Sequence, residues 1–325
     1  MIRMGIIGAS GIAGRALVGP ARSIEEVEIV GVAARDAARA AAFATQNGLD
    51  KVYPTYEALL EDASLDAVYV PLANSLHAKW SVAALEAGRH VLCEKPLASN
   101  AKQAREMVSA GDRENRVLME AFHWRYHPVA ARMIKLSKQI GPLERVEAHF
   151  NAHIPSDNIR FQFDLAGGSF MDLGCYCVHM VRTVVGEGPE VVGAYAVEGP
   201  HGIDLSMRAE LSFPGGVTGV VSSSMVADRT VWPGSMVFRA WGEAGNLEVL
   251  NPMAPQFGHR ITARLADGTM VDEVLESPAS YEHQLRAFCQ VVVDGGGALT
   301  GGADSVANME CIDAVYEASG LGVRH

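Results

Sequence analysis

The sequence predicts an α/β protein of two domains, a doubly wound parallel sheet followed by an α+β domain whose sheet is mostly antiparallel. Its 325 residues exceed the length of a typical single domain. In the first part of the chain, short continuous apolar runs alternate with helical stretches, as in a parallel sheet covered on both faces. Later runs are longer and alternate apolar with polar residues, which indicates antiparallel strands with one face exposed to solvent or packed on another subunit.

The first domain is expected to contain five strands separated by four helices. The apolar runs that we interpret as strands lie at 4–8, 27–34, 65–72, 89–94 and 116–121. The helical stretches between them lie at 12–23, 36–46, 75–88 and 101–115. Because strands and helices alternate strictly, a parallel sheet is the architecture that this order favours.

The second domain is expected to contain about six strands and three helices. The strand-like runs lie at 144–154, 190–199, 204–213, 216–226, 235–245 and 259–275. Turn signals separate them: PGG at 214–216, WPG at 232–234 and ADG at 266–268. Helices are predicted at about 168–186, 279–294 and 303–319, the last of them ended by Gly320.

Composition argues against several classes of protein, namely those that bind nucleic acid, span a membrane or are secreted. A net charge of −11 argues against broad attraction to nucleic acid or to an anionic membrane. No apolar stretch reaches the length of a membrane span, and glycines interrupt the first residues too early for a signal peptide. The five cysteines form no C-x-x-C pair, so we expect reduced thiols in a cytoplasmic protein.

A glycine-rich turn follows the first predicted strand and opens the first predicted helix. It reads Gly8-x-Ser10-x-x-Ala13, a variant of the G-x-G-x-x-G fingerprint in the context that the fingerprint requires. Gly8 allows the tight turn, and a diphosphate then rests on backbone amides. The Ser10 hydroxyl is positioned to donate to a phosphate. The alternative is a glycine-rich turn without a ligand.

The end of the second strand bears on the choice of dinucleotide. A carboxylate there would bind the adenosine ribose of NAD and repel the 2′-phosphate of NADP. Ala34 occupies that position and Arg35 follows, so NADP is favoured, with NAD as the second option. The alternative for Arg35 is a surface ion pair with Asp36.

The sequence Glu94-Lys95-Pro96 ends the strand predicted at 89–94. Ligands bind beyond the carboxyl ends of parallel strands, so Lys95 is expected beside the cofactor. Its ammonium could lower a neighbour's pKa and donate to a substrate hydroxyl. Pro96 fixes the backbone direction, with a cis bond as one option. A Glu–Lys surface pair at the end of a strand is the alternative.

A second group of reactive side chains lies on the helix predicted at 168–186. Asp172 and Tyr176 are four residues apart and therefore project from one helix face, which His179 is positioned to share. A carboxylate, a phenol and an ammonium from Lys95 make a proton-transfer group. The alternative is an acid at a helix N-terminus beside a buried tyrosine.

Three further features receive weaker interpretations. His123 and His127 have the spacing of a metal-binding pair, but no glutamate lies between them, so we predict no metal and a surface or cofactor-side helix. Arg125 and Arg160 either meet a polar substrate or phosphate, or form salt bridges. Cys175 and Cys177 face different ways on a helix, and we assign no redox role to the pair.

Several longer segments resemble the Gfo/Idh/MocA oxidoreductase family, which includes glucose–fructose oxidoreductase and inositol dehydrogenase. They are DAVYVPLANSLHAKWSVAALEAGRHVLCEKPLA, VLMEAFHWRYHP, IRFQFDLAGGSFMDLGCY and DSVANMECIDAVYEASGL, spread over essentially the whole chain. The Glu-Ala-Phe-x-x-Arg and Asp-x-Gly-x-Tyr segments are most similar to the dihydrodiol and aldose dehydrogenase branch.

The resemblance implies a Rossmann domain at 1–122 and a substrate-binding and dimerisation domain with an open-faced sheet at 123–325. Carried over by motif position, it implies a catalytic set of Lys95, Asp172 and Tyr176. Together with the arguments above, it gives this predicted cofactor-binding set: Gly8, Ser10, Gly11, Ile12, Ala13, Arg35, Leu72, Asn74, His77, Glu94, Lys95, Pro96 and Arg125. Departures from the family pattern are Ser10, Ala13, His123 and His179, and the two histidines leave the substrate undetermined.

We therefore predict an enzyme that transfers hydride between NADP and a carbinol carbon of a sugar, polyol or vicinal diol. Tyr176 would act as the base, assisted by Lys95, and Asp172 would position Lys95 and a substrate hydroxyl. Two alternatives remain: a cofactor-assisted enzyme that cleaves glycosides or epimerises without net redox change, and a nicotinamide-binding sensor. We expect a homo-oligomer, dimer or tetramer, formed through the second sheet, with no nucleic acid or membrane partner.

Overall fold

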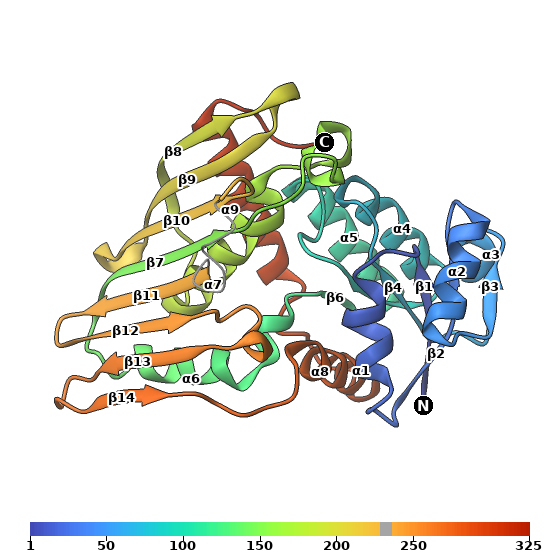
Figure 1. Ribbon diagram of the computed structural model, residues 1–325, viewed down its shortest axis with the longest axis horizontal. Helices are drawn as coiled ribbons and strands as arrows, with labels where there is room; N and C mark the ends of the chain where they lie inside the picture. The colour runs from blue at the N-terminus through green and yellow to red at the C-terminus, as the bar shows by residue number, and fades with distance from the viewer. Residues whose placement is uncertain (228–235) are drawn as a thin grey trace. The chain divides into compact units, whose positions relative to one another are not determined.

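The protein is described here by a computed structural model covering residues 1–227 and 236–325 (Figure 1). Two compact units make up the chain. The first consists of Met1–His123 and Tyr281–Val306, and the second of Trp124–Ser280 and Ala307–His325. The turn predicted at 232–234 lies outside the described residues.

A six-stranded parallel sheet forms the centre of the first unit. Its order is β3-β2-β1-β4-β5-β6, the order of the doubly wound Rossmann fold, which confirms this part of the predicted fold class. The strands are β1 (Ile2–Ile7), β2 (Val27–Ala33), β3 (Lys51–Tyr53), β4 (Ala67–Val70), β5 (His90–Cys93) and β6 (Leu118–Glu120). All four side chains of β4 are buried, as expected for a strand covered on both faces.

The prediction of five strands for this sheet was wrong by one. The additional strand, β3, has only three residues and lies at the edge of the sheet. Lys51 and Val52 are exposed, so β3 has no continuous apolar run that the sequence could have revealed.

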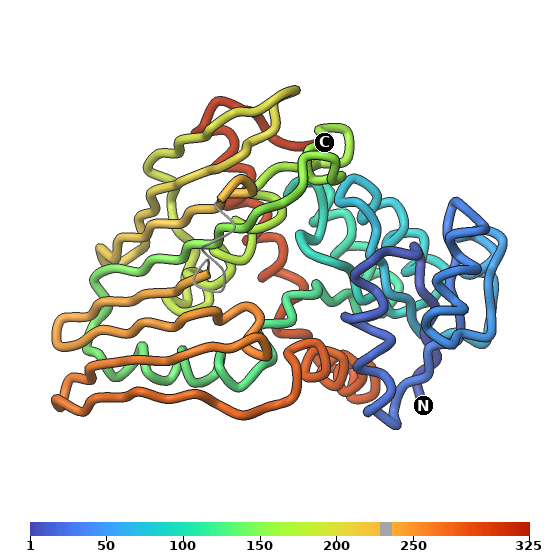
Figure 2. The backbone as a smooth tube through the Cα atoms, in the orientation of Figure 1, coloured from blue at the N-terminus to red at the C-terminus, as the bar shows by residue number. Residues whose placement is uncertain are grey.

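The helices of the first unit follow the predicted stretches closely. They are η1 (Gly14–Val18), α1 (Gly19–Ala21), α2 (Ala37–Asn47), α3 (Tyr56–Leu60), α4 (Asn74–Glu86), α5 (Ala101–Glu114) and α8 (Ser280–Asp294). The predicted stretch at 12–23 is a π-helical turn, η1, continued by the short α1. The α8 segment runs beside α1 (Figure 2), where Arg286 donates to the Ser23 carbonyl at 2.8 Å.

An eight-stranded sheet forms the second unit, in the order β14-β13-β12-β11-β7-β10-β9-β8. Among the strands that the structure describes, only β7 and β10 pair in parallel, so the prediction of a mostly antiparallel sheet is confirmed. The strands are β7 (Leu143–Asn151), β8 (Glu190–Glu198), β9 (Asp204–Ser212), β10 (Thr218–Ser224), β11 (Met236–Gly242), β12 (Gly245–Leu250), β13 (Arg260–Arg264) and β14 (Met270–Glu273).

The predicted number of about six strands was too low for this sheet. The run at 259–275 contains two strands, β13 and β14, joined by the turn predicted at 266–268. The β12 strand follows β11 after only two residues, and the pattern at 235–245 does not reveal that reversal.

Helices cover one face of this sheet. The helical segments of the second unit are η2 (His123–Tyr126), α6 (Pro128–Ser137), η3 (Ile159–Phe161), η4 (Phe163–Leu165), η5 (Phe170–Gly174), α7 (Cys175–Val185), η6 (Pro200–Gly202), η7 (Pro214–Gly216), η9 (Pro255–Phe257) and α9 (Ala303–Ser319). The α7 helix packs on β7 and β10, and α6 packs on β12. Gly320, with φ of 81°, ends α9 as predicted.

The two faces of the sheet differ in chemistry along β7. Val146, Ala148 and Phe150 are buried toward the helices, while Arg145 and His149 point to the opposite, open face. This alternation follows from the two-residue period of a strand. Along β7 the open face therefore carries charged and polar side chains.

The sequence indicated a regular α-helix for the segment that carries Asp172, and this prediction was wrong for the first turn. Residues 170–174 form the π-helical turn η5, and α7 begins only at Cys175. Asp172 and Tyr176 thus lie on either side of a junction, and a spacing of four residues does not by itself place them on one face. Both side chains are buried.

His77 connects the two loops that follow β4 and β5. Its Nε2 lies 3.1 Å from the carbonyl oxygen of Leu72, and its Nδ1 lies 2.9 Å from that of Pro96. The side chain is fully buried, and burial lowers the pKa of His77 to about 4. The neutral ring has one N–H and so donates to one of these two carbonyls, and it lies between the loops on which the predicted cofactor and catalytic residues lie.

We expect His77 to make the protein less stable in mild acid. The unfolded chain takes up a proton at His77 near pH 6.5, whereas the folded chain does so only near pH 4, so stability falls as the pH is lowered through this interval. The free energy of unfolding should decrease by about 2 kcal/mol more in the wild type than in His77→Gln between pH 7.5 and pH 5. Urea titrations at both pH values measure this; equal decreases would contradict it.

Candidate active site

The glycine turn after β1 has the geometry that the fingerprint requires. Gly8 has φ of 118°, and its N–H donates to the Ala33 carbonyl of β2 at 2.8 Å. A Cβ added at Gly8 would lie 2.6 Å from Cδ2 of Leu72. Only glycine fits this position, and Leu72 packs directly on the turn.

The turn offers a polar group for a ligand. The Ser10 hydroxyl is buried and has no hydrogen-bond partner among the described residues. A buried hydroxyl without a partner costs free energy, which an acceptor such as a phosphate oxygen would recover. Space lies open beside Gly11, where an added Cβ would meet no atom within 4 Å. Ile12 and Ala13 continue the turn toward η1. These features fit the diphosphate of a dinucleotide.

The end of β2 leads to two arginines, one of which the sequence analysis missed. Asp36 accepts from the backbone N–H of Arg39 at 3.0 Å as the N-cap of α2, and the structure shows no ion pair between Asp36 and the exposed Arg35 in the described chain. The alternative interpretation of Arg35 is therefore not supported. The Arg39 guanidinium donates to the Ala9 carbonyl in the glycine turn at 2.9 Å. Arg35 precedes the N-cap of α2, so no helical spacing in the sequence pointed to Arg39.

Hydrogen bonds hold the loop around Lys95. The Glu94 carboxylate accepts from the Tyr69 hydroxyl of β4 at 2.6 Å, and the buried Glu120 of β6 accepts from the Leu97 N–H at 2.8 Å. The Lys95–Pro96 peptide bond is cis, one of the options considered for Pro96. Asn74 begins α4 in the neighbouring loop. Lys95 thus occupies a fixed position at the carboxyl end of β5.

The first turn of α8 adds Tyr281, a residue without a recognisable sequence signal. Its ring stacks on His123, with 4.1 Å between the ring centroids. Burial and the negative charge of Glu94 raise the pKa of Tyr281 to about 12, partly offset by the charges of Arg15 and Lys95. The phenol therefore remains protonated, and it belongs to the same unit as Lys95.

The structure separates the roles of His123 and His127. Both are buried, which rules out the surface option in the prediction of a surface or cofactor-side helix. His127 is the N-cap of α6, where its Nδ1 accepts from the Val129 N–H at 3.2 Å. Arg125, between them, is half-buried in η2. In residues 1–227 and 236–325, no group of three His, Cys, Asp or Glu side chains is arranged to hold a metal ion.

The second unit places Asp172 beside an arginine. The Arg160 Nε lies 2.6 Å from the Asp172 carboxylate, which decides the open question about Arg160 in favour of an ion pair. Tyr176 packs edge-on against Phe150 of β7, with 6.0 Å between the ring centroids. His179, further along α7, accepts from the Trp124 indole N–H at 3.0 Å.

The predicted site residues thus form two groups. The glycine turn, Leu72, His77 and the loop of Lys95 belong to the first unit, and Asp172 and Tyr176 belong to the second. The first group offers a dinucleotide turn and an ammonium, and the second offers a carboxylate–guanidinium pair and a phenol. These are groups that bind a dinucleotide and move a proton.

Two other expectations bear on the chemistry. All five cysteines are buried and none forms a disulfide within the described residues. Burial raises the pKa of Cys289 to about 11 and that of Cys311 to about 12, so these two thiols are unreactive at neutral pH. Within the described residues, no helix combines the length and apolar character needed to cross a membrane.

Comparisons with known proteins agree with this geometry. The family model described as "Oxidoreductase family, NAD-binding Rossmann fold" matches residues 2–122, and that of the "GFO/IDH/MocA C-terminal domain" matches residues 127–248. D-xylose 1-dehydrogenase (NADP(+)) 2 of Haloferax volcanii is 37% identical over 98% of this chain and 97% of its own length. Trans-1,2-dihydrobenzene-1,2-diol dehydrogenase of Xenopus tropicalis is 36% identical over 62% of each chain.

Among solved structures, KijD10, a 3-ketoreductase from Actinomadura kijaniata in complex with NADP and TDP-benzene, is similar over 98% of this chain and 97% of its own. The TM-score is 0.88 and the identity is 28%. The predictions of an oxidoreductase and of a nicotinamide dinucleotide cofactor are thereby confirmed. The chain belongs to the Gfo/Idh/MocA oxidoreductase family.

Proposed function

We propose that this protein is an NADP-dependent dehydrogenase or reductase that acts on a carbinol carbon of a sugar, polyol or vicinal diol. The observation that carries the proposal is the fixed loop of Lys95. Hydrogen bonds from three side chains hold it: those of Glu94 with Tyr69, of His77 with Pro96, and of Glu120 with Leu97. Such support keeps a reactive group in a productive position.

The dinucleotide would lie on the glycine turn. Gly8, Ser10, Gly11, Ile12 and Ala13 would hold the diphosphate, and Arg35 with Arg39 would meet the 2′-phosphate of NADP. The nicotinamide, when bound, supplies the hydride chemistry. We propose that the remaining members of the predicted set also serve cofactor binding: Leu72, Asn74, His77, Glu94, Lys95, Pro96 and Arg125. The His77 ring is fully buried, so it would act indirectly, through its contacts with the Leu72 and Pro96 carbonyls of the two loops.

The protein's own part in the reaction is proton transfer. In the oxidative direction Tyr176 would take the proton of the substrate hydroxyl, and the ammonium of Lys95 would favour the phenolate. Asp172 is paired with Arg160, so we propose that this pair orients a substrate hydroxyl. This assignment differs from the earlier expectation that Asp172 positions Lys95.

The relatives support the substrate class. The Haloferax relative is by its name a xylose dehydrogenase that uses NADP, the Xenopus relative oxidises a vicinal diol, and KijD10 is a 3-ketoreductase. All three act at an oxygen-bearing carbon. We also propose that residues 1–122 bind the dinucleotide, that residues 123–325 bind the substrate, and that the enzyme works in the cytoplasm.

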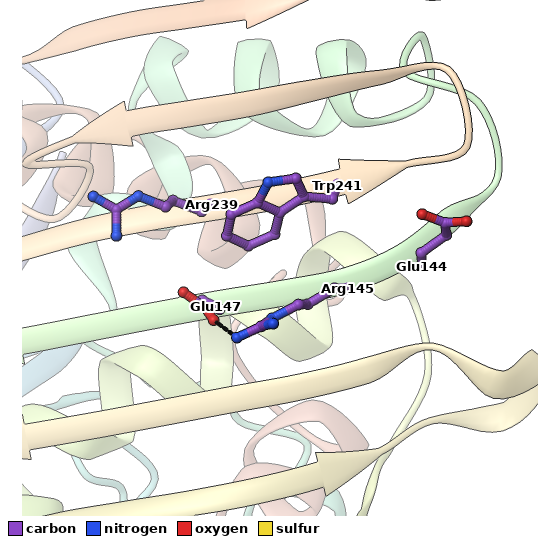
Figure 3. A pocket seen from close by; sticks show the side chains of 5 residues that line it. All are labelled: Glu144, Arg145, Glu147, Arg239 and Trp241. Carbon is purple, nitrogen blue, oxygen red and sulfur yellow. Dashed lines mark hydrogen bonds and ion pairs between the residues drawn. The ribbon is translucent and has the colours of Figure 1, made fainter.

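We further propose that the open face of the second sheet binds a second copy of the chain. Glu144, Arg145, Glu147, Arg239 and Trp241 line a shallow hollow there (Figure 3). Arg239 faces Glu147 across β11 and β7, and Trp241 faces Arg145. Acids and bases alternate on the patch, so a twofold axis would bring opposite charges together. Trp and Arg also contribute most to binding in many interfaces.

The catalytic assignment predicts a large loss of turnover in Lys95→Met and Tyr176→Phe. Removing a proton-transfer group costs about 10²–10⁴-fold in rate. The rate of NADPH formation with D-xylose, other aldoses, polyols and trans-diols measures turnover. Lys102→Met on α5 and the exposed Tyr195→Phe on β8 serve as matched controls and should remain active. Full turnover in both site variants would defeat the assignment.

The two arginines should differ in their effect on cofactor choice. Arg35→Ala should raise KM for NADP by about tenfold or more and leave KM for NAD unchanged, because a charged hydrogen bond is worth about 1.5–3 kcal/mol. Arg39→Ala should raise KM for both dinucleotides, since Arg39 also holds the Ala9 carbonyl. Steady-state kinetics with each cofactor test this, with Arg22→Ala as the charge-matched control. An unchanged NADP to NAD ratio in Arg35→Ala would refute the role of Arg35.

The assembly proposal is tested by sedimentation equilibrium. Arg239→Glu replaces the ion pair of Arg239 with Glu248 by an acid beside Glu147 and Glu248, and it should weaken self-association by about tenfold or more. Trp241→Ala should act in the same direction through lost contact area. Lys102→Glu in the first unit makes the same charge change and should leave the mass unchanged. A wild-type protein that sediments as a monomer would rule out this interface.

A further inference from the structure

A fully buried carboxylate lies next to the turn that carries Asp172. Asp204, the first residue of β9, has no exposed surface. Its Oδ1 accepts from the Tyr316 hydroxyl at 2.8 Å and from Arg324 Nη2 at 2.9 Å. Its Oδ2 accepts from the Phe170 N–H at 2.7 Å and from the Ser169 hydroxyl at 2.9 Å. Four donors from three parts of the chain therefore converge on one side chain.

Arg324 balances the charge of this carboxylate. It follows α9 and is also fully buried, which is costly for an arginine unless it is paired. Its guanidinium lies over the rings of Tyr316 and Phe163, at 4.3 Å and 4.9 Å from their centroids. Burial and the charge of Asp204 raise the pKa of Tyr316, so its hydroxyl stays a donor.

The Asp204 cluster fixes the backbone just before Asp172. Ser169 and Phe170, both bonded to Asp204, lie three and two residues before Asp172, whose own N–H donates to the Gly168 carbonyl at 3.1 Å. Gly168 has φ of 127°, and a Cβ there would collide with Asp204 Oδ1. Asp204 thus contacts the start of the η5 turn in three ways: it accepts from the Ser169 side chain and from the Phe170 backbone, and it leaves no room for a side chain at position 168.

The same cluster reaches the loop that carries Arg160. The Gly168 N–H donates to the Arg160 carbonyl at 2.9 Å, and Phe163 of this loop lies under the Arg324 guanidinium. Arg160 in turn pairs with Asp172 at 2.6 Å. The backbones of Arg160 and Asp172 therefore both bond to Gly168, which is followed by the two residues that donate to Asp204.

We propose that Asp204 and Arg324 are positioning residues of the active site, and that their ion pair fixes the orientation of the Asp172 carboxylate toward the substrate. The inference rests on the proposed function for the role of Asp172. A displacement of about 1 Å in a substrate-orienting group can cost about 10²-fold in rate, so a buried support of this kind affects turnover. Neither residue touches the substrate in this assignment.

The test compares Arg324→Met, which removes the charge, with Arg324→Lys, which restores it. Arg132→Gln is the matched control because it removes the half-buried pair with Glu273 at 2.5 Å in the same unit. In Arg324→Met, kcat should fall by about tenfold or more while KM for NADP stays within about twofold, and Arg324→Lys should recover part of kcat. Hydrogen exchange of the peptide at 168–176 should quicken in Arg324→Met and not in Arg132→Gln.

If Arg324→Met does not fold, Tyr316→Phe and Ser169→Ala replace it, since each removes one uncharged donor to Asp204. Unchanged exchange at 168–176 together with a kcat equal to that of Arg132→Gln would overturn the proposal. The exchange measurement does not depend on activity. A wild-type protein without hydride transfer would therefore refute the proposed function, while the exchange comparison would still decide whether Asp204 and Arg324 hold the η5 turn.

Discussion

The hydrogen bond from the Leu97 N–H to the buried carboxylate of Glu120 is the constraint on which the first half of the site depends. Lys95 follows a parallel strand, where the ladder ends and backbone groups need other partners. The Glu120 carboxylate of β6 is the partner of the Leu97 N–H, and the His77 ring of α4 contacts the Pro96 carbonyl. Because these partners are buried, water cannot replace them easily, and the loop has one well-defined conformation.

The second half of the site uses the same device. Asp204 accepts the Phe170 N–H as Glu120 accepts the Leu97 N–H, in each case within two residues of a predicted catalytic side chain. A carboxylate suits this task because it accepts from several donors at once. The supporting charge thus acts on the backbone next to the predicted catalytic side chain.

The elements that could be predicted from the sequence are those with a clear pattern of apolar residues. The site residues that could be predicted are those that belong to a sequence motif. Continuous apolar strands and the Gly8 turn were found because burial on both faces and a positive φ leave few residue choices. The β3 strand was missed because it is short and exposed. Tyr281, Arg39 and Asp204 were missed because their partners are distant in sequence, and nothing at their own positions encodes those contacts.

The π-helical turn η5 shows why spacing alone was insufficient for Asp172. In an α-helix the first N–H groups have no carbonyl partner within the helix, and Asp204 of β9 accepts from one of them, that of Phe170. The Asp172 N–H still donates to the Gly168 carbonyl four residues earlier, and the π-helical turn Phe170–Gly174 is wider than an α-helix. The rule that residues four apart share one face therefore does not hold across this turn. In our proposal, the direction of the Asp172 carboxylate is a property of the packed unit, set by β9 and by Arg324 beyond α9.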